Sequence, residues 1–182
     1  YSKQFIRNKY LSNSKLNFAE NLLSKNDNTK AITFISENSY REQITWHDLN
    51  LNVNKIANYF KYLKVKKNER VAAYLPNIIE TVECFLATSA IGAIWSSCSP
   101  DFGSKGVIER FVQIKPKILI VADRYYYNGK EINIIQRLNE ILKKIKSIKT
   151  VIIVNYPGKK LLNYKKAKKI KFVNLKNIKK SK

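Results

Sequence analysis

Short apolar runs and stretches of helical periodicity alternate along the middle of the chain. The apolar runs predict strands at residues 70–75, 93–97, 117–122 and 150–154. The apolar residues at helical spacing predict helices at residues 78–91, 104–115 and 134–145. The last two strands are apolar almost throughout, which is typical of strands covered on both faces. This order favours an α/β fold with a doubly wound, largely parallel sheet and flanking helices.

The first seventy residues predict a smaller arrangement beside this sheet. Residues 1–14 are polar and predict irregular structure, and the segments after them predict a short helix at 16–23 and a hairpin of strands at 31–35 and 41–44. Thr45 then resembles the N-cap of a capping box, with the Asp48 carboxylate three residues later. The helix behind it is predicted to end near Leu63. Its predicted core face consists of Leu49, Val53, Ile56, Ala57, Phe60 and Leu63.

Ligands of doubly wound sheets bind outside the carboxyl ends of the strands, so the loops that leave those ends are the candidate sites. These loops are residues 76–77, 97–103 and 123–130. The second loop gathers small, hydroxyl-bearing and turn-forming residues, and Ser104 behind it is the predicted N-cap of the next helix. The third contains three consecutive tyrosines and a glycine, and we expect an aromatic loop at residues 125–130.

The formal net charge of +22 raises the alternative of a protein that binds nucleic acid or another polyanion. Residues 159–182 contain 11 lysines and no acidic residue, so the preceding residues carry 35 − 11 − 13, or +11. Lysine and asparagine are scattered there rather than gathered in one stripe. We therefore interpret the charge as a compositional bias toward Lys, Asn and Ile and expect no specific nucleic-acid partner.

Cysteine content and hydropathy limit the remaining classes. Cys84 and Cys98 have neither a metal-ligand spacing nor a disulfide framework, so we expect reduced thiols and a cytoplasmic location. No apolar run reaches transmembrane length, which gives no reason to expect a membrane partner. The chain begins with Tyr1 and contains no Met, and we expect it to be a fragment of a longer protein.

Residue chemistry alone offers few catalytic candidates. His47, the one histidine, falls in the first turn of a predicted helix and is expected to be solvated. Cys98 has no histidine to activate it and is interpreted as a small loop residue. Neither a phosphate-binding glycine loop with Lys and Ser or Thr nor a GxGxxG sequence is present. Lys130, next to Asn128 and Gly129, suits an anion, although in so lysine-rich a chain a solvated surface lysine is the alternative.

Several segments resemble the acyl-CoA synthetases of the adenylate-forming superfamily, and in particular the acetoacetyl-CoA synthetases. They are residues 16–23, 44–46, 70–77, 91–103 and 110–117. The most specific of them reads Ile91-Gly92-Ala93-Ile94-Trp95-Ser96-Ser97-Cys98-Ser99-Pro100-Asp101-Phe102-Gly103. The resemblance covers about residues 16–155. It implies the N-terminal part of the large domain of an AMP-forming acetoacetate–CoA ligase, which forms an acyl-adenylate from ATP with Mg²⁺ and then transfers the acyl group to CoA.

The family's Ser/Thr/Gly-rich phosphate loop, adenine and ribose motifs and mobile C-terminal domain are absent from this sequence, so no catalytic residue and no metal ligand is assigned. We expect the fragment to be inactive alone and to need the remainder of its own chain. In related acetyl-CoA synthetases a segment of the Arg-Gly-Gly-Lys type contacts the CoA nucleotide phosphate. The resemblance aligns Tyr127, Asn128, Gly129 and Lys130 with this segment, and only the last two match. It also places Ser99, Pro100 and Asp101 near the pantetheine channel.

The resemblance divides the chain into an N-terminal segment with the short helix (1–30), a partial AMP-binding domain (31–158) and a Lys-rich linker or end (159–182), with a short strand at residues 170–175. Three alternatives remain open from the sequence. One is another short-chain acyl-CoA synthetase, the second is a basic non-catalytic domain that binds polyanions, and the third is a truncated relic that folds poorly.

Overall fold

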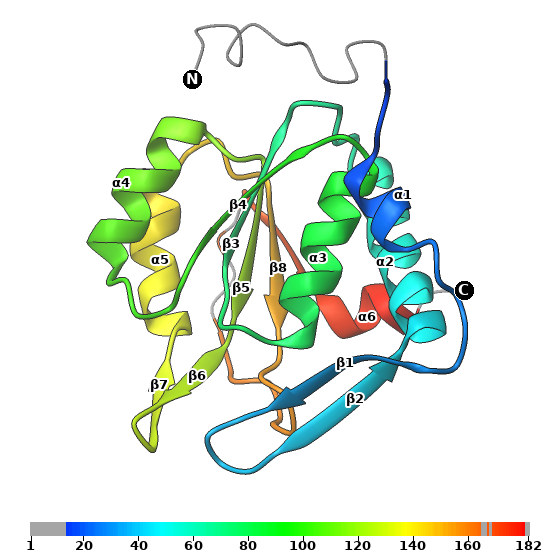
Figure 1. The fold of residues 1–182 in the computed structure, drawn as a ribbon. Helices are drawn as coiled ribbons and strands as arrows, with labels where there is room; N and C mark the ends of the chain where they lie inside the picture. Colours follow the sequence, from blue (N-terminus) through cyan, green and yellow to red (C-terminus); the bar gives the residue numbers. More distant parts are fainter. Residues whose placement is uncertain (1–13, 165–166, 168, 181–182) are drawn as a thin grey trace, which may run out of the picture.

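A parallel sheet of five strands forms the centre of the protein. The computed structural model describes residues 14–164, 167 and 169–180, so the predicted irregular segment at residues 1–14 lies almost entirely outside the described residues. The strands, in spatial order, are β4 (Ile94–Cys98), β3 (Arg70–Tyr74), β5 (Ile118–Ala122), β8 (Thr150–Val154) and β9 (Lys171–Asn174) (Figure 1). All four pairings are parallel. The predicted parallel α/β sheet is therefore confirmed.

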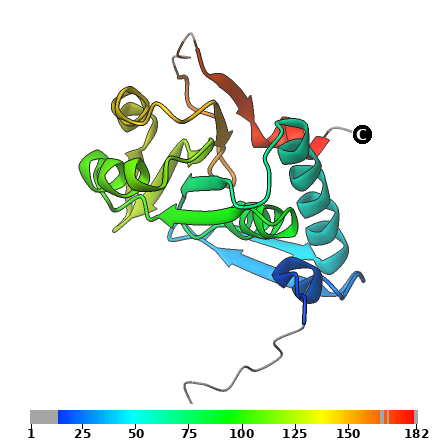
Figure 2. The ribbon, with the colours of Figure 1, turned by 90° about the horizontal axis from the view of Figure 1, so that it is seen from above.

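Helices cover both faces of the sheet, which explains why β5 and β8 are buried along their whole length (Figure 2). One face carries α4 (Ser104–Ile114) and α5 (Ile135–Lys144), which pack on each other. The other carries α3 (Ile79–Ala90), with α2 (Trp46–Tyr62) packed on it and the short α1 (Phe18–Leu22) beside it. Strand β3 thus precedes a crossover on one face, and β4 precedes a crossover on the other, as in a doubly wound sheet.

The helix α2 begins and packs as its sequence predicts. Thr45 is its N-cap, and Thr45 Oγ1 accepts a hydrogen bond of 3.0 Å from the Asp48 amide. The predicted core residues of this helix are buried from Leu49 to Phe60. His47 is exposed in the first turn, as expected of a solvated histidine. The predicted cap of α4 is wrong: Gly103 occupies the N-cap position without a side-chain bond, and Ser104 is the first helical residue.

Two antiparallel hairpins lie at the carboxyl ends of the sheet strands, at the bottom of Figure 1. One joins β1 (Lys30–Ile35) to β2 (Arg41–Thr45), as predicted. The other joins β6 (Arg124–Tyr127) to β7 (Lys130–Asn133), where an aromatic loop was expected. The turn residues Asn128 and Gly129 have φ angles of 50° and 71°. Asn-Gly adopts this left-handed geometry readily, and the turn it makes matches the twist of the flanking strands, so a hairpin forms instead of a loop.

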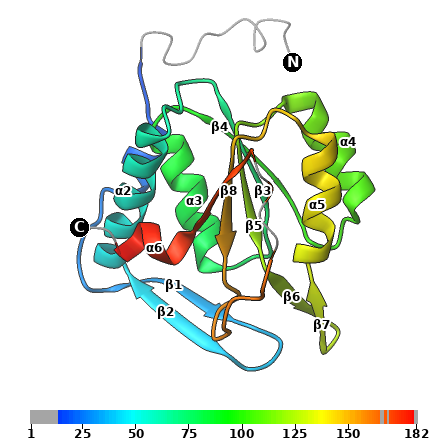
Figure 3. The ribbon, with the colours of Figure 1, turned by 180° about the vertical axis from the view of Figure 1, so that it is seen from behind.

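The last described segment contributes to the core rather than serving only as a linker. The short strand predicted near residues 170–175 is present as β9 at the edge of the sheet. It leads directly into an unpredicted helix, α6 (Leu175–Lys180), which packs against α2 (Figure 3). Lys179 of α6 forms a 2.8 Å ion pair with Glu83 of α3, whose side chain is fully buried. Glu83 therefore holds this C-terminal helix against α3.

Within residues 14–164, 167 and 169–180, no helix is long and apolar enough to cross a membrane.

Candidate functional site

The order of the sheet strands locates a candidate ligand site between β3 and β5. The chain passes from β3 outward to β4 and then returns across β3 to β5, so the direction of winding reverses there. Ligands of doubly wound sheets bind at the carboxyl ends of the strands beside such a reversal. Three of the segments that leave this edge are residues 99–103 after β4, the β6–β7 hairpin after β5, and residues 155–163 after β8.

Tyr74, the last residue of β3, organises the loop that follows β4. Its side chain is fully buried, and its hydroxyl donates a 2.6 Å hydrogen bond to the carbonyl of Phe102. Arg137 of α5 donates to the Tyr74 hydroxyl at 2.8 Å and to the carbonyl of Pro100 at 2.9 Å. Burial raises the pKa of Tyr74 and outweighs the opposing effect of Arg137, so the phenol stays protonated and able to donate.

The predicted channel residues Ser99, Pro100 and Asp101 lie in this loop and are held by short hydrogen bonds. Ser99 Oγ donates to Asp101 Oδ2 at 2.6 Å. Asp101 also hydrogen-bonds the phenol of Tyr125 in β6, and this contact, added to burial, raises the pKa of Tyr125. The structure therefore brings the loop after β4 and the hairpin after β5 together, as two parts of one site at the same edge of the sheet.

The two thiols are poor nucleophiles in this structure. Cys98 is the last residue of β4 and is 4% exposed, and burial raises the pKa of its thiol. Cys84 is fully buried in α3, and burial raises its pKa further. Because only the thiolate attacks, both environments disfavour covalent catalysis. The interpretation of Cys98 as a loop residue is wrong, since Cys98 ends strand β4 and pairs with Tyr74 of β3.

The predicted phosphate-contact residues form the exposed tip of the β6–β7 hairpin. Tyr127 and Lys130 pair across the strands, and the Asn128-Gly129 turn connects them. All four residues are exposed. The Gly129 amide donates a 3.1 Å hydrogen bond to Oε2 of Glu37, a residue of the β1–β2 turn. A backbone donor of this tip therefore already binds an anionic oxygen, and the Lys130 ammonium belongs to the same tip.

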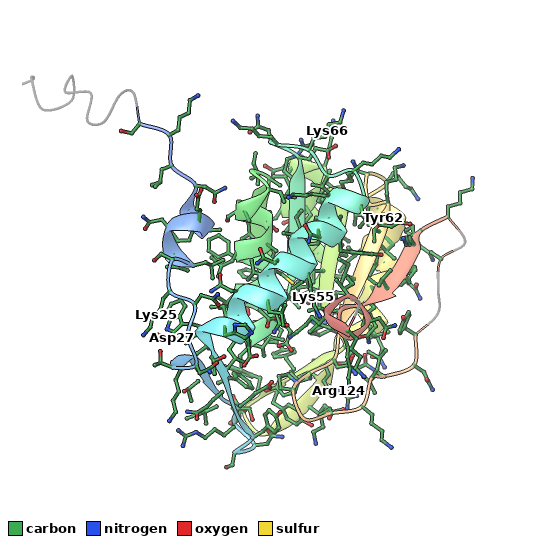
Figure 4. The ribbon with its side chains drawn as sticks, turned by 90° about the vertical axis from the view of Figure 1, so that its right-hand side faces the viewer. Lys25, Asp27, Lys55, Tyr62, Lys66 and Arg124 are labelled. Carbon is green, nitrogen blue, oxygen red and sulfur yellow. The ribbon has the colours of Figure 1, made fainter. Side chains whose placement is uncertain are left out.

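A buried cluster of charges, which sequence reasoning missed, holds the base of the hairpin. Asp123 follows β5, is fully buried, and accepts hydrogen bonds from the amides of Tyr156 at 2.9 Å and Leu162 at 3.0 Å. Arg124, which is labelled in Figure 4, forms ion pairs with Asp123 at 3.2 Å and with Glu131 at 3.1 Å. Burial alone would lower the pKa of Arg124, but these two carboxylates raise it. An Asp-Arg pair directly after a fully buried strand was the available signal.

The arrangement is suited to binding an anion rather than to carrying out chemistry. It combines an exposed turn amide and an ammonium with a loop whose geometry is fixed by buried hydrogen bonds. Among the described residues, no group of three His, Cys, Asp or Glu side chains is placed to hold a metal ion. The one histidine, His47, lies at the start of α2 and outside these three segments. This edge therefore offers a loop held by hydrogen bonds and a hairpin tip with a turn amide and an ammonium.

Comparison with known proteins defines the family to which this chain belongs. A model of the family described as "AMP-binding enzyme" matches residues 19–180, which is most of the chain. The chain belongs to the AMP-binding enzyme family.

Its relatives within this family include acetoacetyl-CoA synthetases. The acetoacetyl-coenzyme A synthetase of Rhizobium meliloti (strain 1021) is 40% identical over 150 residues, which cover 82% of this chain and 23% of that protein. A solved structure, acetoacetyl-CoA synthetase from Streptomyces lividans, aligns with a TM-score of 0.81 at 30% identity and covers 91% of this chain and 25% of its own. A more distant relative is a malonamoyl-CoA synthetase of Penicillium aethiopicum, 34% identical over 147 residues, which cover 78% of this chain and 20% of that protein.

The resemblance drawn from residues 91–103 is thus confirmed. The chain spans about a quarter of the length of the relatives that it matches.

Proposed function

We propose that this chain forms the CoA-binding side of an AMP-forming acetoacetate–CoA ligase and acts as part of a larger enzyme. The proposed overall reaction converts ATP, acetoacetate and CoA into acetoacetyl-CoA, AMP and diphosphate. The hairpin tip is the observation that supports the assignment to the CoA-binding side. There the Gly129 amide already binds a carboxylate oxygen, and Lys130 supplies a positive charge. Its position at the carboxyl edge of a doubly wound sheet supports the same assignment.

In this proposal the tip binds the phosphate of the CoA nucleotide. Lys130 contributes a charge-assisted contact, and the Asn128-Gly129 turn contributes backbone donors. Arg124 and Glu131 fix the base of the hairpin, so the tip is held in one orientation before CoA arrives. Binding of CoA then carries little ordering cost at this end of the molecule.

The loop of Ser99, Pro100 and Asp101 walls the channel for the pantetheine arm in the same proposal. The hydrogen bonds from Tyr74 and Arg137 to the carbonyls of the loop satisfy these polar groups within the protein. The hydroxyl of Ser99 donates to the carboxylate of Asp101, and no histidine lies in this loop to activate it. The loop therefore acts as a rigid surface and not as a source of nucleophiles.

The names of the relatives support a class of acid substrate. Acetoacetate and malonamate are both short carboxylates with a carbonyl group two carbons away, so we propose that the acid is of this type, with acetoacetate as the first candidate. Another short oxo-acid remains the alternative. ATP and Mg²⁺ enter the proposal as requirements of the family's reaction, and no residue of this chain is assigned to them.

In this proposal the enzyme is cytoplasmic. Its partners are small molecules and the remainder of its own chain, and they include neither a specific nucleic acid nor a membrane. The two unpaired cysteines support a reducing compartment. Part of the lysine excess is also structural, since Lys179 and Lys117 are held in ion pairs with glutamates.

The decisive experiment separates the two half-reactions in a complete ligase that carries this segment. Lys130→Ala is expected to raise the KM for CoA about tenfold, as for the loss of one charge-assisted hydrogen bond. Acetoacetate-dependent release of diphosphate should be unchanged, because it precedes CoA binding. Lys144→Ala is the control, since Lys144 is also an exposed lysine but ends α5 at the opposite edge of the sheet. Equal damage to both half-reactions would exclude the proposed contact.

A further inference from the structure

The proposed phosphate anchor is already occupied by a side chain of the same protein. Glu37 lies 92 residues before Gly129 in the sequence, yet its Oε2 atom accepts the Gly129 amide hydrogen bond at 3.1 Å. Both residues are exposed, so burial does not force the contact. A carboxylate that lies on a left-handed turn amide occupies the position that an incoming phosphate oxygen needs.

An aromatic interface packs the two hairpins against each other and so supports the contact between Glu37 and Gly129. Tyr156 follows β8 and is almost fully buried between them. Its ring lies 6.4 Å from that of Phe34 in β1, in an edge-on arrangement, and 5.2 Å from that of Tyr126 in β6. Each hairpin therefore packs one ring against Tyr156, and this shared contact holds the two hairpins close together.

The turn that carries Glu37 is itself well held. Ser36 is buried, and its Oγ accepts a hydrogen bond from the Tyr40 amide at 3.1 Å and also contacts the Asn38 side chain. The ring of Tyr40 packs over Gly158, so closely that a Cβ atom added to this glycine would lie 2.7 Å from the ring. Glu37 is thus presented to the β6–β7 tip by a turn that is anchored on both sides.

We propose that Glu37 competes with the phosphate of CoA for the Gly129 amide and so weakens the binding of CoA at the tip. This inference rests on the proposed function of the tip. A singly charged carboxylate yields to a phosphomonoester, because the phosphate carries up to two negative charges and three acceptor oxygens and also attracts Lys130. A ligand without that phosphate has no group that displaces Glu37, so it binds with the contact left in place. The contact therefore lowers the affinity for CoA and leaves the affinity for a ligand without this phosphate nearly unchanged.

The test uses the ¹⁵N amide resonances of Gly129 and Lys130 in a complete ligase that carries this segment, titrated with CoA and with 3′-dephospho-CoA. Glu37→Gln should move the free Gly129 resonance and tighten CoA binding about two- to tenfold, because glutamine keeps an acceptor oxygen but loses the charge that strengthens the competing hydrogen bond. It should also widen the preference for CoA over 3′-dephospho-CoA, because only CoA has to displace the side chain at position 37. Glu140→Gln is the matched control, since it also removes one exposed negative charge, but from α5.

The outcomes distinguish the competition by Glu37 from the proposed binding of CoA at the tip. Resonance shifts at Lys130 with CoA, combined with unchanged or weaker binding in Glu37→Gln, would overturn the competition while leaving the CoA contact in place. The same tightening in Glu140→Gln would also overturn it, because general charge would then be the cause. If CoA moves neither Gly129 nor Lys130 in any variant, the proposed function of the tip fails and this inference fails with it.

Discussion

The hydroxyl of Tyr74 lies 2.8 Å from Nη1 of Arg137, and the two residues share the carbonyl groups of one loop. Tyr74 donates to Phe102, and Arg137 donates to Pro100. A strand of the central sheet and a helix on its surface therefore both hold the loop that walls the proposed CoA channel. The loop has no regular secondary structure of its own, so these side chains determine its shape.

Tyr74→Phe removes the hydroxyl of this pair and should lower the free energy of unfolding by about 1 kcal/mol, because the 2.6 Å hydrogen bond from the phenol to the Phe102 carbonyl is lost. The loop should also loosen more than the protein as a whole. Urea unfolding measures the first effect, and hydrogen exchange of the amides at residues 101–103 measures the second. Tyr62→Phe is the control, since Tyr62 is 70% exposed. Equal exchange in the two variants would show that Tyr74 does not fix the loop.

Two glycines with the same backbone angle allow strain and crowding to be separated. Gly129 and Gly158 both have φ of 71°, but a Cβ atom at Gly129 meets nothing within 4 Å, whereas one at Gly158 lies 2.7 Å from the ring of Tyr40. Gly129→Ala should therefore cost about 1 kcal/mol for the left-handed backbone alone. Gly158→Ala should cost about 2–4 kcal/mol, because the ring of Tyr40 must also move.

Thermal or urea unfolding of both variants tests this prediction. Combining Gly158→Ala with Tyr40→Ala should reduce the difference, since the double variant keeps the strained angle but loses the clash. If the two single variants are equally stable, crowding by Tyr40 contributes nothing.

The central sheet could be predicted from the sequence because its signal is local. The strands at residues 117–122 and 150–154 are apolar on both faces, and the helices between them show clear periodicity. The cap at Thr45 is equally local, since it depends on a carboxylate three residues away. Ser104 shows the limit of this reasoning, because a hydroxyl residue beside a helix start was interpreted as the cap although Gly103 holds that position.

The site was less predictable because its contacts join distant parts of the chain. Glu37 and Gly129 are 92 residues apart, and nothing near either residue signals the other. The β6–β7 hairpin was missed for a different reason, since its Asn-Gly turn was treated as part of a loop. Helix α6 is a third case. Three of its six residues are lysine, so the sequence suggests a solvated end, whereas the helix docks through the buried Leu175 and Ile178 and through the ion pair of Lys179 with the distant Glu83.

Removing the ammonium of Lys179 should destabilise the protein strongly. Lys179→Met leaves the fully buried Glu83 without its counter-charge, and loss of one partner of a buried ion pair costs about 3–5 kcal/mol. Asn52 also hydrogen-bonds Glu83, so Glu83→Gln retains a partner and should recover much of this loss when the two substitutions are combined. Urea unfolding of the single and double variants gives the coupling energy. A fully additive result would show that the pair does not hold α6 in place.

The charged groups around Lys179 also predict that stability depends on pH, and Glu80 is the group responsible. Burial raises the pKa of Glu80 to about 7, and the neighbouring Glu83 adds to this effect, while Lys179 at 3.9 Å opposes it. Glu42 also raises it. Lys179 is already engaged by Glu83 at 2.8 Å, and Oε2 of Glu80 is buried without a hydrogen-bond partner. A second carboxylate beside a single ammonium is therefore disfavoured in its charged form.

The folded protein thus keeps the proton of Glu80 in the range between the ordinary pKa of 4.5 and about 7, where the unfolded chain has released it. Stability should fall as the pH rises through this range and then level off, by up to about 3 kcal/mol for a shift of this size. Glu80→Gln stays neutral at every pH and should lose this dependence. Because all other groups are shared, the difference in unfolding free energy between wild type and Glu80→Gln, measured in urea from about pH 5 to 8.5, isolates Glu80. The variant should become increasingly favoured as the pH rises, and a difference that stays constant over this range would mean that Glu80 is charged in the folded state throughout.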